Sequence, residues 1–439
     1  MKRFVTTVLC AALVFSFVLI FASCGQKNYA AKNTEFYIGA SGPLTGGASV
    51  YGIAVENAAK MAVEEINAAG GVNGVKLKFV MIDDKHDASN VSANYTKMFE
   101  EGMQVALGCV TTQPCLEFKA LSHEDNLFFL TPSASADAVV EYDNAYQMCF
   151  ADNKQGAKAA EYVLANCTGK SVGVLYRADD AYSTGILSEF EKGLGGMSIV
   201  KTSFTGNTVA SFASQIEQLK NCDFIFLPIY SAPAAQFMTE AKNTVKRDAI
   251  YYGCDGLDGI DTSVEGFDIN TIPQEVSFLS HFNSKATEGA AKDFIDKYTK
   301  KYGTATLNQF AASAYDCVYA IAKALEKANV SVTASPSEVC DALKGVFQGG
   351  FTFSDGSTFI LRLNEYYFDG EQVIAGFTMQ SNAAGHMIDR NSEEFARMQT
   401  YMPEAAPMPR YDVARRLLPD ALYDAFMAEY KKEGSAWAV

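Results

Sequence analysis

The chain of 439 residues is short of positive charge. Its 36 lysines and arginines stand against 51 aspartates and glutamates, for a formal net charge of −15. A surface of that sign repels phosphate backbones and anionic lipid headgroups through Coulomb forces. The charge balance therefore argues against nucleic acid as a partner.

Residues that usually carry catalysis and metal binding are also scarce. The four histidines, His86, His123, His281 and His386, stand in no GxSxG, HExxH or similar local arrangement. The chain has no CxxC pair, so neither a zinc site nor a disulfide framework is indicated. We expect no metal and no cofactor, and nothing in the sequence supports an enzyme.

Two segments partly match phosphate-binding motifs, but neither has the spacing or the position that the motif requires. Residues 169–171 have the ending of a P-loop, but Leu164 stands where the first glycine belongs, and the tripeptide precedes its strand instead of following it. Gly253, Gly256 and Gly259 do follow an expected strand, but without the GxGxxG spacing. Dinucleotide binding is therefore not expected.

The first 23 residues have the pattern of an export signal. Lys2 and Arg3 form a short positive region, and residues 4–22 are almost wholly apolar. Small residues immediately before Cys24 resemble a bacterial lipobox, so we expect lipidation of Cys24 and a short linker over residues 24–33. The alternative is an uncleaved anchor, because the apolar run is about long enough to span a bilayer.

The remainder of the chain predicts an α/β fold in two lobes, because roughly 400 residues exceed one ordinary core. Apolar strand-like runs alternate with amphipathic helical stretches, which is typical of βαβ units and a mainly parallel sheet. The helix expected over residues 50–69 ends at a pair of glycines. The expected strands are residues 36–40, 76–82, 104–108, 127–130, 171–176, 223–227 and 249–253.

Hydroxyl-rich loops follow two neighbouring expected strands. Thr111 and Thr112 lie in the first loop, and Ser133 and Ser135 lie in the second. Ligands of doubly wound sheets collect at the carboxyl ends of strands, so these donors should converge and would suit a carboxylate. Each hydroxyl taken alone is more simply a helix N-cap, but their recurrence in neighbouring loops favours a ligand site.

Aromatic residues and one acid follow strands in the second half of the chain. Tyr182 and Tyr230 come after two strands, and Asp255 comes after another. A free α-amino acid needs donors for its carboxylate, an anion for its ammonium and walls that exclude water. The two halves of the chain together offer that combination.

Several segments occur in an order that points to a family: residues 38–46 followed by Tyr51-Gly52, then 62–74, 83–84, 108–112, 131–136 and 310–316. This order resembles the branched-chain amino acid ABC transporter binding proteins, from about residue 34 to residue 354. The resemblance implies a two-lobed type I periplasmic-binding-protein fold, each lobe being a parallel sheet flanked by helices.

The resemblance also implies how the chain divides between the lobes. The N-terminal lobe would comprise residues 34–151 and 281–348, and the C-terminal lobe residues 152–280 and 349–380. Three crossings would join them, near residues 151–153, 278–282 and 346–353. Residues 381–439, where methionine, proline and charge replace the alternating pattern, are expected to form a helical C-terminal extension of unknown role.

The resemblance assigns a role to each candidate site residue. The ligand carboxylate would bind, partly through backbone N–H groups, at Thr111, Thr112, Ser133, Ala134 and Ser135; the ammonium would pair with Asp255; and the cleft would close on Tyr51, Tyr182 and Tyr230. His86 stands where some relatives carry a cysteine that pairs near the first hydroxyl loop. Cys109 could therefore be free or pair with Cys115.

The function implied is that of a lipid-anchored extracellular solute-binding protein. It would capture an amino acid, branched-chain or otherwise hydrophobic, and deliver it as a monomer to the permease subunits of an ABC transporter with cytoplasmic ATPases. An alternative is a sensory or binding module for amides, urea or aromatic acids. A surface hydrolase built on Asp83 and Asp84 is a third, although adjacent residues of a strand point to opposite faces.

Overall fold

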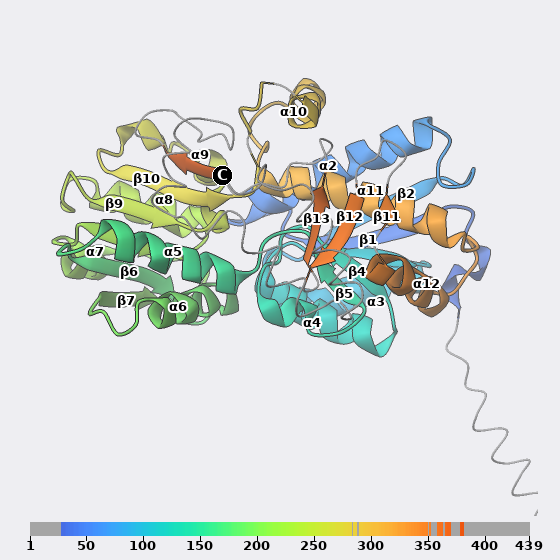
Figure 1. Ribbon diagram of the computed structural model, residues 1–439, viewed down its shortest axis with the longest axis horizontal. Helices are drawn as coiled ribbons and strands as arrows, with labels where there is room; N and C mark the ends of the chain where they lie inside the picture. Colours follow the sequence, from blue (N-terminus) through green and yellow to red (C-terminus); the bar gives the residue numbers. More distant parts are fainter. Residues whose placement is uncertain are drawn as a thin grey trace, which may run out of the picture.

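The computed structural model describes residues 28–349 except residues 283 and 288, together with four short strands between residues 351 and 381. Two lobes lie side by side along the longest axis, and each is built on one mainly parallel sheet with helices against it (Figure 1). Within the described residues, no helix is both long enough and apolar enough to cross a membrane.

The sheet of the N-terminal lobe has eight strands in the order β11-β12-β13-β5-β4-β3-β1-β2. Its parallel centre consists of β1 (Phe36–Gly42), β2 (Leu77–Asp83), β3 (Val105–Cys109), β4 (Phe128–Thr131) and β5 (Ala145–Gln147). Every residue of β1 is buried, as expected for a strand covered on both faces. The edge beyond β5 is extended by β11 (Phe351–Thr352), β12 (Thr358–Arg362) and β13 (Glu365–Asp369).

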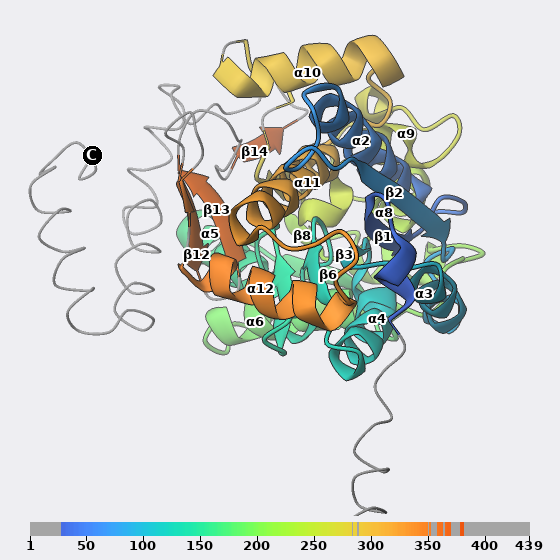
Figure 2. The ribbon, with the colours of Figure 1, turned by 90° about the vertical axis from the view of Figure 1, so that its right-hand side faces the viewer.

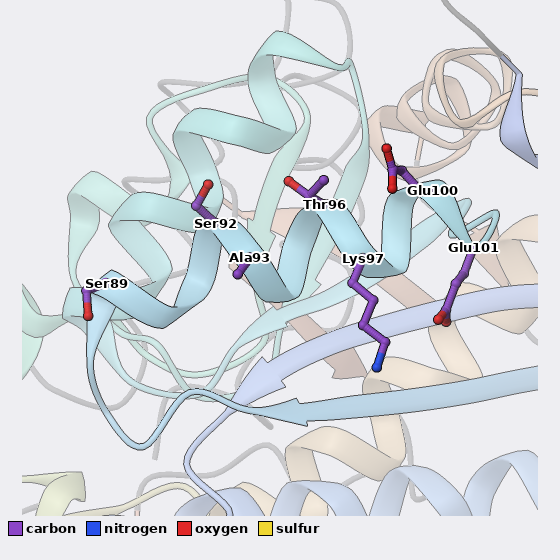
Figure 3. Close-up of a pocket in the computed structure, with 7 residues that line it drawn as sticks. All are labelled: Ser89, Ser92, Ala93, Thr96, Lys97, Glu100 and Glu101. Carbon is purple, nitrogen blue, oxygen red and sulfur yellow. The ribbon is translucent and has the colours of Figure 1, made fainter.

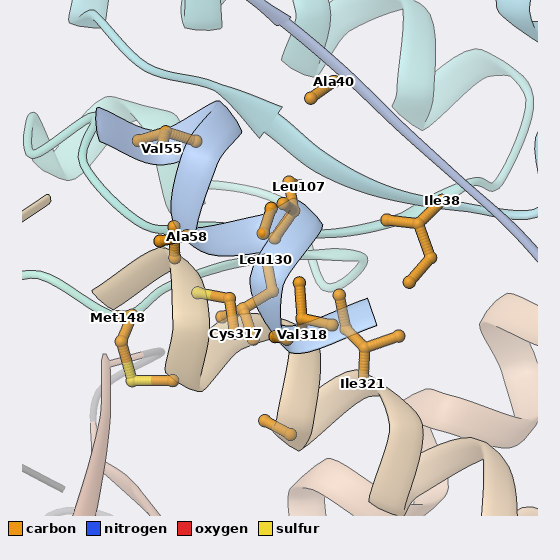
Figure 4. Close-up of a cluster of buried hydrophobic side chains, with 14 of the residues drawn as sticks. Ile38, Ala40, Val55, Ala58, Leu107, Leu130, Met148, Cys317, Val318 and Ile321 are labelled. Atoms are coloured by element: carbon orange, nitrogen blue, oxygen red, sulfur yellow. The ribbon is translucent and has the colours of Figure 1, made fainter. Parts of the chain in front are cut away.

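Helices cover both faces of this sheet because its side chains alternate between them. Ile38 of β1 packs with one set of helices and its neighbour Tyr37 with the other. The first set is α2 (Ser49–Ala68), α10 (Gly289–Tyr302), α11 (Gln309–Ala328) and α12 (Pro336–Gly349), and the second is α3 (Val91–Glu100) and α4 (Thr112–Glu124). Figure 4 shows Val55 and Ala58 of α2 together with Cys317 and Val318 of α11 in the main core of this lobe.

Helix α10 lies alongside α2 at the outside of the N-terminal lobe (Figure 2). Glu65 of α2 fixes this arrangement, because its carboxylate pairs with Lys297 of α10 at 3.0 Å. The same carboxylate accepts hydrogen bonds from the hydroxyls of Tyr315 and Tyr319 of α11. One acid thus joins three helices that are far apart in the sequence.

The sheet of the C-terminal lobe has the order β14-β10-β9-β8-β6-β7. Its strands are β6 (Val172–Arg177), β7 (Val200–Phe204), β8 (Phe224–Leu227), β9 (Ile250–Gly253), β10 (Glu275–Ser280) and the antiparallel β14 (Thr378–Ser381). One face packs on α5 (Asp152–Asn166) and α6 (Ala181–Gly193), and the other on α7 (Ala213–Leu219), α8 (Ser231–Ala241) and α9 (Ile260–Ser263). Short 3₁₀ turns are η1 (Tyr29–Lys32), η2 (Ala88–Asn90), η3 (Asp137–Val140), η4 (Asp255–Leu257) and η5 (Ile269–Thr271).

The α/β class and the parallel sheets predicted from the sequence are confirmed. All seven expected strands are present with ends shifted by at most two residues, and the helix expected over residues 50–69 is α2. The expected strands did not include β5, which has three residues, β7, an edge strand whose first two residues are exposed, or β10, which lies buried between β9 and β14. Neither β5 nor β7 needs the long apolar run that marks a central strand, and the apolar run of β10 is interrupted by Ser277 and ends at Ser280.

The path of the chain near its C-terminus differs from the predicted division. Residues 349–380 were assigned to the C-terminal lobe, but β11, β12 and β13 pair in the N-terminal sheet, and only β14 joins the C-terminal sheet. The third passage between lobes therefore lies after β13 and not at residues 346–353. The reason is that β13 pairs with Gln147 at the open edge of β5, and a strand's sequence does not reveal which edge it will join.

Several predictions concern residues outside the described part of the chain. These are the export signal over residues 1–23, the lipidation of Cys24 and all but the first residue of the extension over residues 381–439. They stay predictions.

Candidate functional site

A small cavity lies between the two lobes, where the carboxyl ends of both sheets meet. Eight of the nine predicted binding residues line it, namely Tyr51, Thr111, Thr112, Ser133, Ser135, Tyr182, Tyr230 and Asp255. The first five belong to the N-terminal lobe and the last three to the C-terminal lobe. Its volume is about 10 Å³, which is roughly the space of one water molecule. The structure therefore represents a closed arrangement of the lobes.

The first hydroxyl loop leaves β3 and enters α4. Thr111 occupies the N-cap position of α4, yet its side chain makes no capping hydrogen bond. Its Oγ1 lies 2.9 Å from Nδ1 of His86 instead. The hydroxyl of Thr112 is buried and has no hydrogen-bond partner. The N-cap interpretation therefore does not explain either threonine.

The second hydroxyl loop follows β4 and is tied to the first. The hydroxyl of Thr131 donates to the carbonyl of Cys109 at 2.7 Å, and its oxygen accepts from the N–H groups of Ser133 and Ala134. Ser133 and Ser135 reach the cavity, whereas Ala134 does not line it and its N–H is already bonded. Thr131, which the sequence interpretation passed over, thus holds both loops in place.

Tyrosine rings form the wall contributed by both lobes. Tyr230 stacks on Tyr182 with ring centroids 4.7 Å apart, and Tyr51 approaches Tyr230 at 5.7 Å. Phe310, at the start of α11, lies edge-on to Tyr51 at 5.1 Å. The hydroxyl of Tyr230 is buried without a hydrogen-bond partner. This wall excludes water and leaves one polar atom unused.

The acid of the C-terminal lobe is held by a buried network. Asp255 Oδ1 accepts hydrogen bonds from the Tyr182 hydroxyl at 2.7 Å and from Gln155 Nε2 at 3.0 Å. Gln155 Nε2 also lies 3.2 Å from Asp152 Oδ1, so one amide contacts both acids. Burial raises the pKa of Asp255 to about 6, and burial together with the charge of Asp255 raises the pKa of Asp152 well above its usual range. A cationic group placed here would relieve the buried charge.

Gly256 lets this network close. A side chain at Gly256 would place its Cβ 2.6 Å from the hydroxyl oxygen of Tyr182, so only glycine fits. Its N–H donates to that same oxygen at 3.0 Å. The sequence analysis did not identify Gln155 and Asp152 as part of the site, although both lie at or beside the predicted crossing over residues 151–153. The Asp-Gly pair after β9 was the available signal for Gly256.

Direct hydrogen bonds join the lobes around the cavity. The hydroxyl of Tyr51, from the N-terminal lobe, donates to the carbonyl of Gly256 at 2.5 Å and accepts from the N–H of Ser231 at 2.8 Å. Asp258 of the C-terminal lobe accepts from the N–H of Gln309 at 2.9 Å, at the first residue of α11. All three bonds would break if the lobes separated.

His86 takes part in the same interface. Its ring lies 5.0 Å from that of Tyr230, and burial lowers its pKa to about 4, so it is neutral at physiological pH. Cys109 and Cys115 are both buried and unbridged, as are the other six cysteines of the described residues. At residue 86, where some relatives have a cysteine, this chain thus has a histidine whose ring contacts Tyr230 of the other lobe.

A separate hollow of about 670 Å³ lies on the outside of the N-terminal lobe along α3 (Figure 3). It is lined by Ser89, Ser92, Ala93, Thr96, Lys97, Glu100 and Glu101. All of these come from α3, the turn before it or the residue that follows it, and none from the C-terminal lobe. The hollow therefore has no means of responding to lobe closure. No cluster of residues suited to a metal ion occurs in the described part of the chain.

Two α/β lobes with a polar site enclosed between them define a bilobed ligand-binding protein with the type I periplasmic-binding fold. The family model described as periplasmic binding protein matches residues 35–360, so the chain belongs to this family. The resemblance stated from the motifs is thereby confirmed.

Named relatives have the same character. A leucine-, isoleucine-, valine-, threonine- and alanine-binding protein of Pseudomonas aeruginosa is 28% identical over 337 residues, which cover 74% of this chain and 86% of the relative. A Leu/Ile/Val-binding protein homolog of Brucella melitensis is 24% identical, over 73% of this chain and 84% of its own. These relatives are solute-binding proteins, not enzymes.

Solved structures share the fold. A branched-chain amino acid transporter substrate-binding protein of Streptococcus pneumoniae, in complex with isoleucine, has a TM-score of 0.67 and 24% identity and covers 81% of this chain and 98% of its own. A solute-binding protein of Rhodopseudomonas palustris in complex with benzoate has a TM-score of 0.65 at 17% identity, over 81% of this chain and 95% of its own. At these identities the likeness concerns the fold alone.

Proposed function

We propose that the protein captures a free amino acid between its lobes and delivers it to the permease of an ABC transporter. Branched-chain and other hydrophobic amino acids are the first candidates, because the relatives in Pseudomonas and Brucella carry names of that kind. The observation that carries the proposal is the unused hydroxyl of Thr112 facing the same cavity as the buried carboxylate of Asp255.

The two lobes divide the recognition of the ligand. The hydroxyl loops of the N-terminal lobe would bind its carboxylate, and Asp255 of the C-terminal lobe would bind its ammonium. A ligand can favour closure only if it contacts both lobes, and this division meets that condition. Sites for small molecules occupy roughly 300–1,000 Å³, so a cavity of about 10 Å³ must widen by lobe movement to admit one.

The proposed anchor at Cys24 belongs to the same mechanism. A lipid on Cys24 and a short linker would hold the protein at the membrane surface and raise its effective concentration near the permease. Mass spectrometry of the mature N-terminus would detect the acyl groups, and Cys24→Ala should release the protein from the membrane fraction. Membrane association that is unchanged in Cys24→Ala would contradict the lipid anchor.

Calorimetry with leucine, isoleucine, valine and a wider amino acid panel tests the binding proposal. Asp255→Ala should weaken amino acid binding by about 2 kcal/mol or more, because the ammonium loses a buried, hydrogen-bonded partner. An aromatic acid has no ammonium, so its binding should be insensitive to the same change. Amino acid affinity that is unaltered in Asp255→Ala would remove that residue from the site, and tight binding of benzoate alone would favour the alternative ligand class.

A further inference from the structure

A second and larger chamber lies between the lobes beside the small cavity. This outer chamber has a volume of about 900 Å³, and Tyr230 lines both spaces. Residues 46–48, Lys85 and His86 reach it from the N-terminal lobe, and the rest of its wall belongs to the C-terminal lobe. It is therefore the space into which a ligand held by the hydroxyl loops could extend.

Asp180 is the buried charged group of this chamber whose bonding is incomplete. Its side chain is 3% exposed, and its Oδ2 has no hydrogen-bond partner. Asp180 stands at the N-cap of α6, where the N–H groups of Ser183 and Tyr182 lie close enough to its carboxylate to lower its pKa, but neither completes a capping hydrogen bond. Burial raises the pKa of Asp180 to about 6 despite the nearby charge of Arg177. A carboxylate desolvated in this way gains from an external donor.

The cations near Asp180 do not serve that purpose. Arg177 donates through Nε to Asp179 at 2.8 Å, and its Nη1 is bonded to the side chain of Asn207. Lys85 is exposed, so water screens its charge. At Asp180 the outer chamber therefore offers a buried acceptor with negative charge, and not a site for an anion.

Part of the wall of the outer chamber is apolar and is suited to a methylene stem. The outer chamber is lined by Phe204, Val209, Ile229, Pro233 and Phe267. Methylene groups of a long side chain bury well on such a surface while a charged end group finds a polar partner. The branched four-carbon side chain of leucine would not use this length.

We propose that the outer chamber receives the ligand's side chain and that Asp180 binds an N–H donor at its end. The preferred ligands are then α-amino acids with a long methylene stem ending in an amine or guanidinium. This inference rests on the amino acid capture proposed above and specifies the side chain. Both ends of the ligand would bind buried acids of the C-terminal lobe, Asp255 at the α-ammonium and Asp180 at the terminal group.

Calorimetry on the purified full chain with lysine, arginine, norleucine and glutamate tests the proposal. Norleucine has a linear stem without the terminal ammonium, so its comparison with lysine isolates that group. Lysine or arginine should bind at least about tenfold more tightly than norleucine. Asp180→Asn should bring that ratio close to one and leave the norleucine affinity unchanged. Glu217→Gln, an exposed acid on α7 in the same lobe, is the matched control and should preserve the ratio.

The possible outcomes distinguish a failure of the Asp180 proposal from a failure of the proposed amino acid capture. If norleucine binds as tightly as lysine and arginine, if glutamate binds best, or if Asp180→Asn keeps the wild-type ratio, the role of Asp180 is wrong while amino acid capture stands. If no amino acid of this panel or of the branched-chain set binds, the proposed function itself fails. Thermal denaturation of both variants in the absence of ligand checks that each is folded.

Discussion

At the scale of single residues, the hydroxyls of the two N-terminal loops divide into two kinds. The hydroxyl of Thr131 forms hydrogen bonds within the protein, with one backbone carbonyl and two backbone N–H groups. Thr112, only three residues from the end of β3, has a buried hydroxyl without a partner. A buried polar group that forms no bond destabilises the protein that carries it. The first kind supports the fold, and the second is available for a ligand.

Substituting valine for each threonine separates these roles. Thr112→Val removes an unsatisfied hydroxyl, so it should leave thermal stability unchanged or raised while weakening ligand binding by about 1 kcal/mol or more. Thr131→Val leaves buried backbone groups unbonded and should lower stability by about 1–3 kcal/mol. Denaturant unfolding and calorimetry measure the two effects. Equal losses of stability in both variants would contradict the distinction.

At the scale of elements, the start of α11 is the point where the C-terminal lobe contacts the N-terminal lobe through a charge. Asp258 accepts a hydrogen bond from the N–H of Gln309, where the helix has unsatisfied donors and a partial positive charge. Burial nevertheless dominates and raises the pKa of Asp258 from its usual 3.8 to about 7. The side chain of Asn308 already caps this helix, because its Oδ1 accepts from the N–H groups of Phe310 and Ala311. Asp258 therefore provides a further acceptor at the same helix end.

This raised pKa predicts a pH effect with a definite sign. The folded protein holds the proton of Asp258 more tightly than the unfolded chain does, so its contribution to stability is full at low pH and is lost as the pH rises through about 7. Asp258→Asn keeps the acceptor and removes the titration. The free energy of unfolding of the variant relative to wild type should therefore rise between pH 5 and pH 7, by up to about 1.4 kcal/mol per unit.

Thermal or urea unfolding at several pH values measures the difference. Asp84, Asp180 and Asp255 also have pKa values raised to about 6, so they too make the stability of the wild-type protein depend on pH. The test is therefore the difference in unfolding free energy between Asp258→Asn and wild type at each pH. A difference that does not vary with pH would show that Asp258 is ionised throughout.

Elements also show how far sequence reasoning reaches. Most central strands and α2 were predictable because burial on both faces requires continuous apolar runs, and burial on one face requires a helical stripe. Strand β10 was missed, because Ser277 interrupts its apolar run. Strands β12 and β13 were assigned to the wrong lobe because edge pairing depends on which neighbour is open in three dimensions. The order of strands in a sheet is a property of the assembled lobe.

At the scale of the whole molecule, the two lobes are held together by side chains of the site itself. Tyr51 bonds across the interface to Gly256 and Ser231, while its ring packs on Tyr230. The same tyrosines would surround the ligand, so closure and binding draw on the same groups. The equilibrium between open and closed forms is therefore set at the site.

Tyr51→Phe should shift that equilibrium without disturbing either lobe. The ring contacts persist, but the hydrogen bonds of the Tyr51 hydroxyl with the N–H and Oγ of Ser231 and with the carbonyl of Gly256 are lost, at a cost of about 1 kcal/mol each. Small-angle scattering of the ligand-free variant should give a larger radius of gyration than the wild type, and saturating ligand should reduce the difference. Asn57, on the same helix but remote from the cavity, offers Asn57→Ala as a control expected to match the wild type. Identical scattering from Tyr51→Phe and wild type would show that the hydroxyl does not hold the lobes.

The sequence by itself determined the α/β class, the positions of most central strands and the loops that carry the site, because periodicity and strand-end chemistry are local properties of the chain. It also placed hydroxyls and an acid where they could meet, and eight of the nine chosen residues do line one cavity. Only the tertiary structure decided which of them are already bonded, as Ala134 is, and which are left unused, as Thr112 is. It alone brought Gln155 to Asp255 and placed Asp180 beside a large chamber, because contacts between segments many residues apart arise only when the chain is folded.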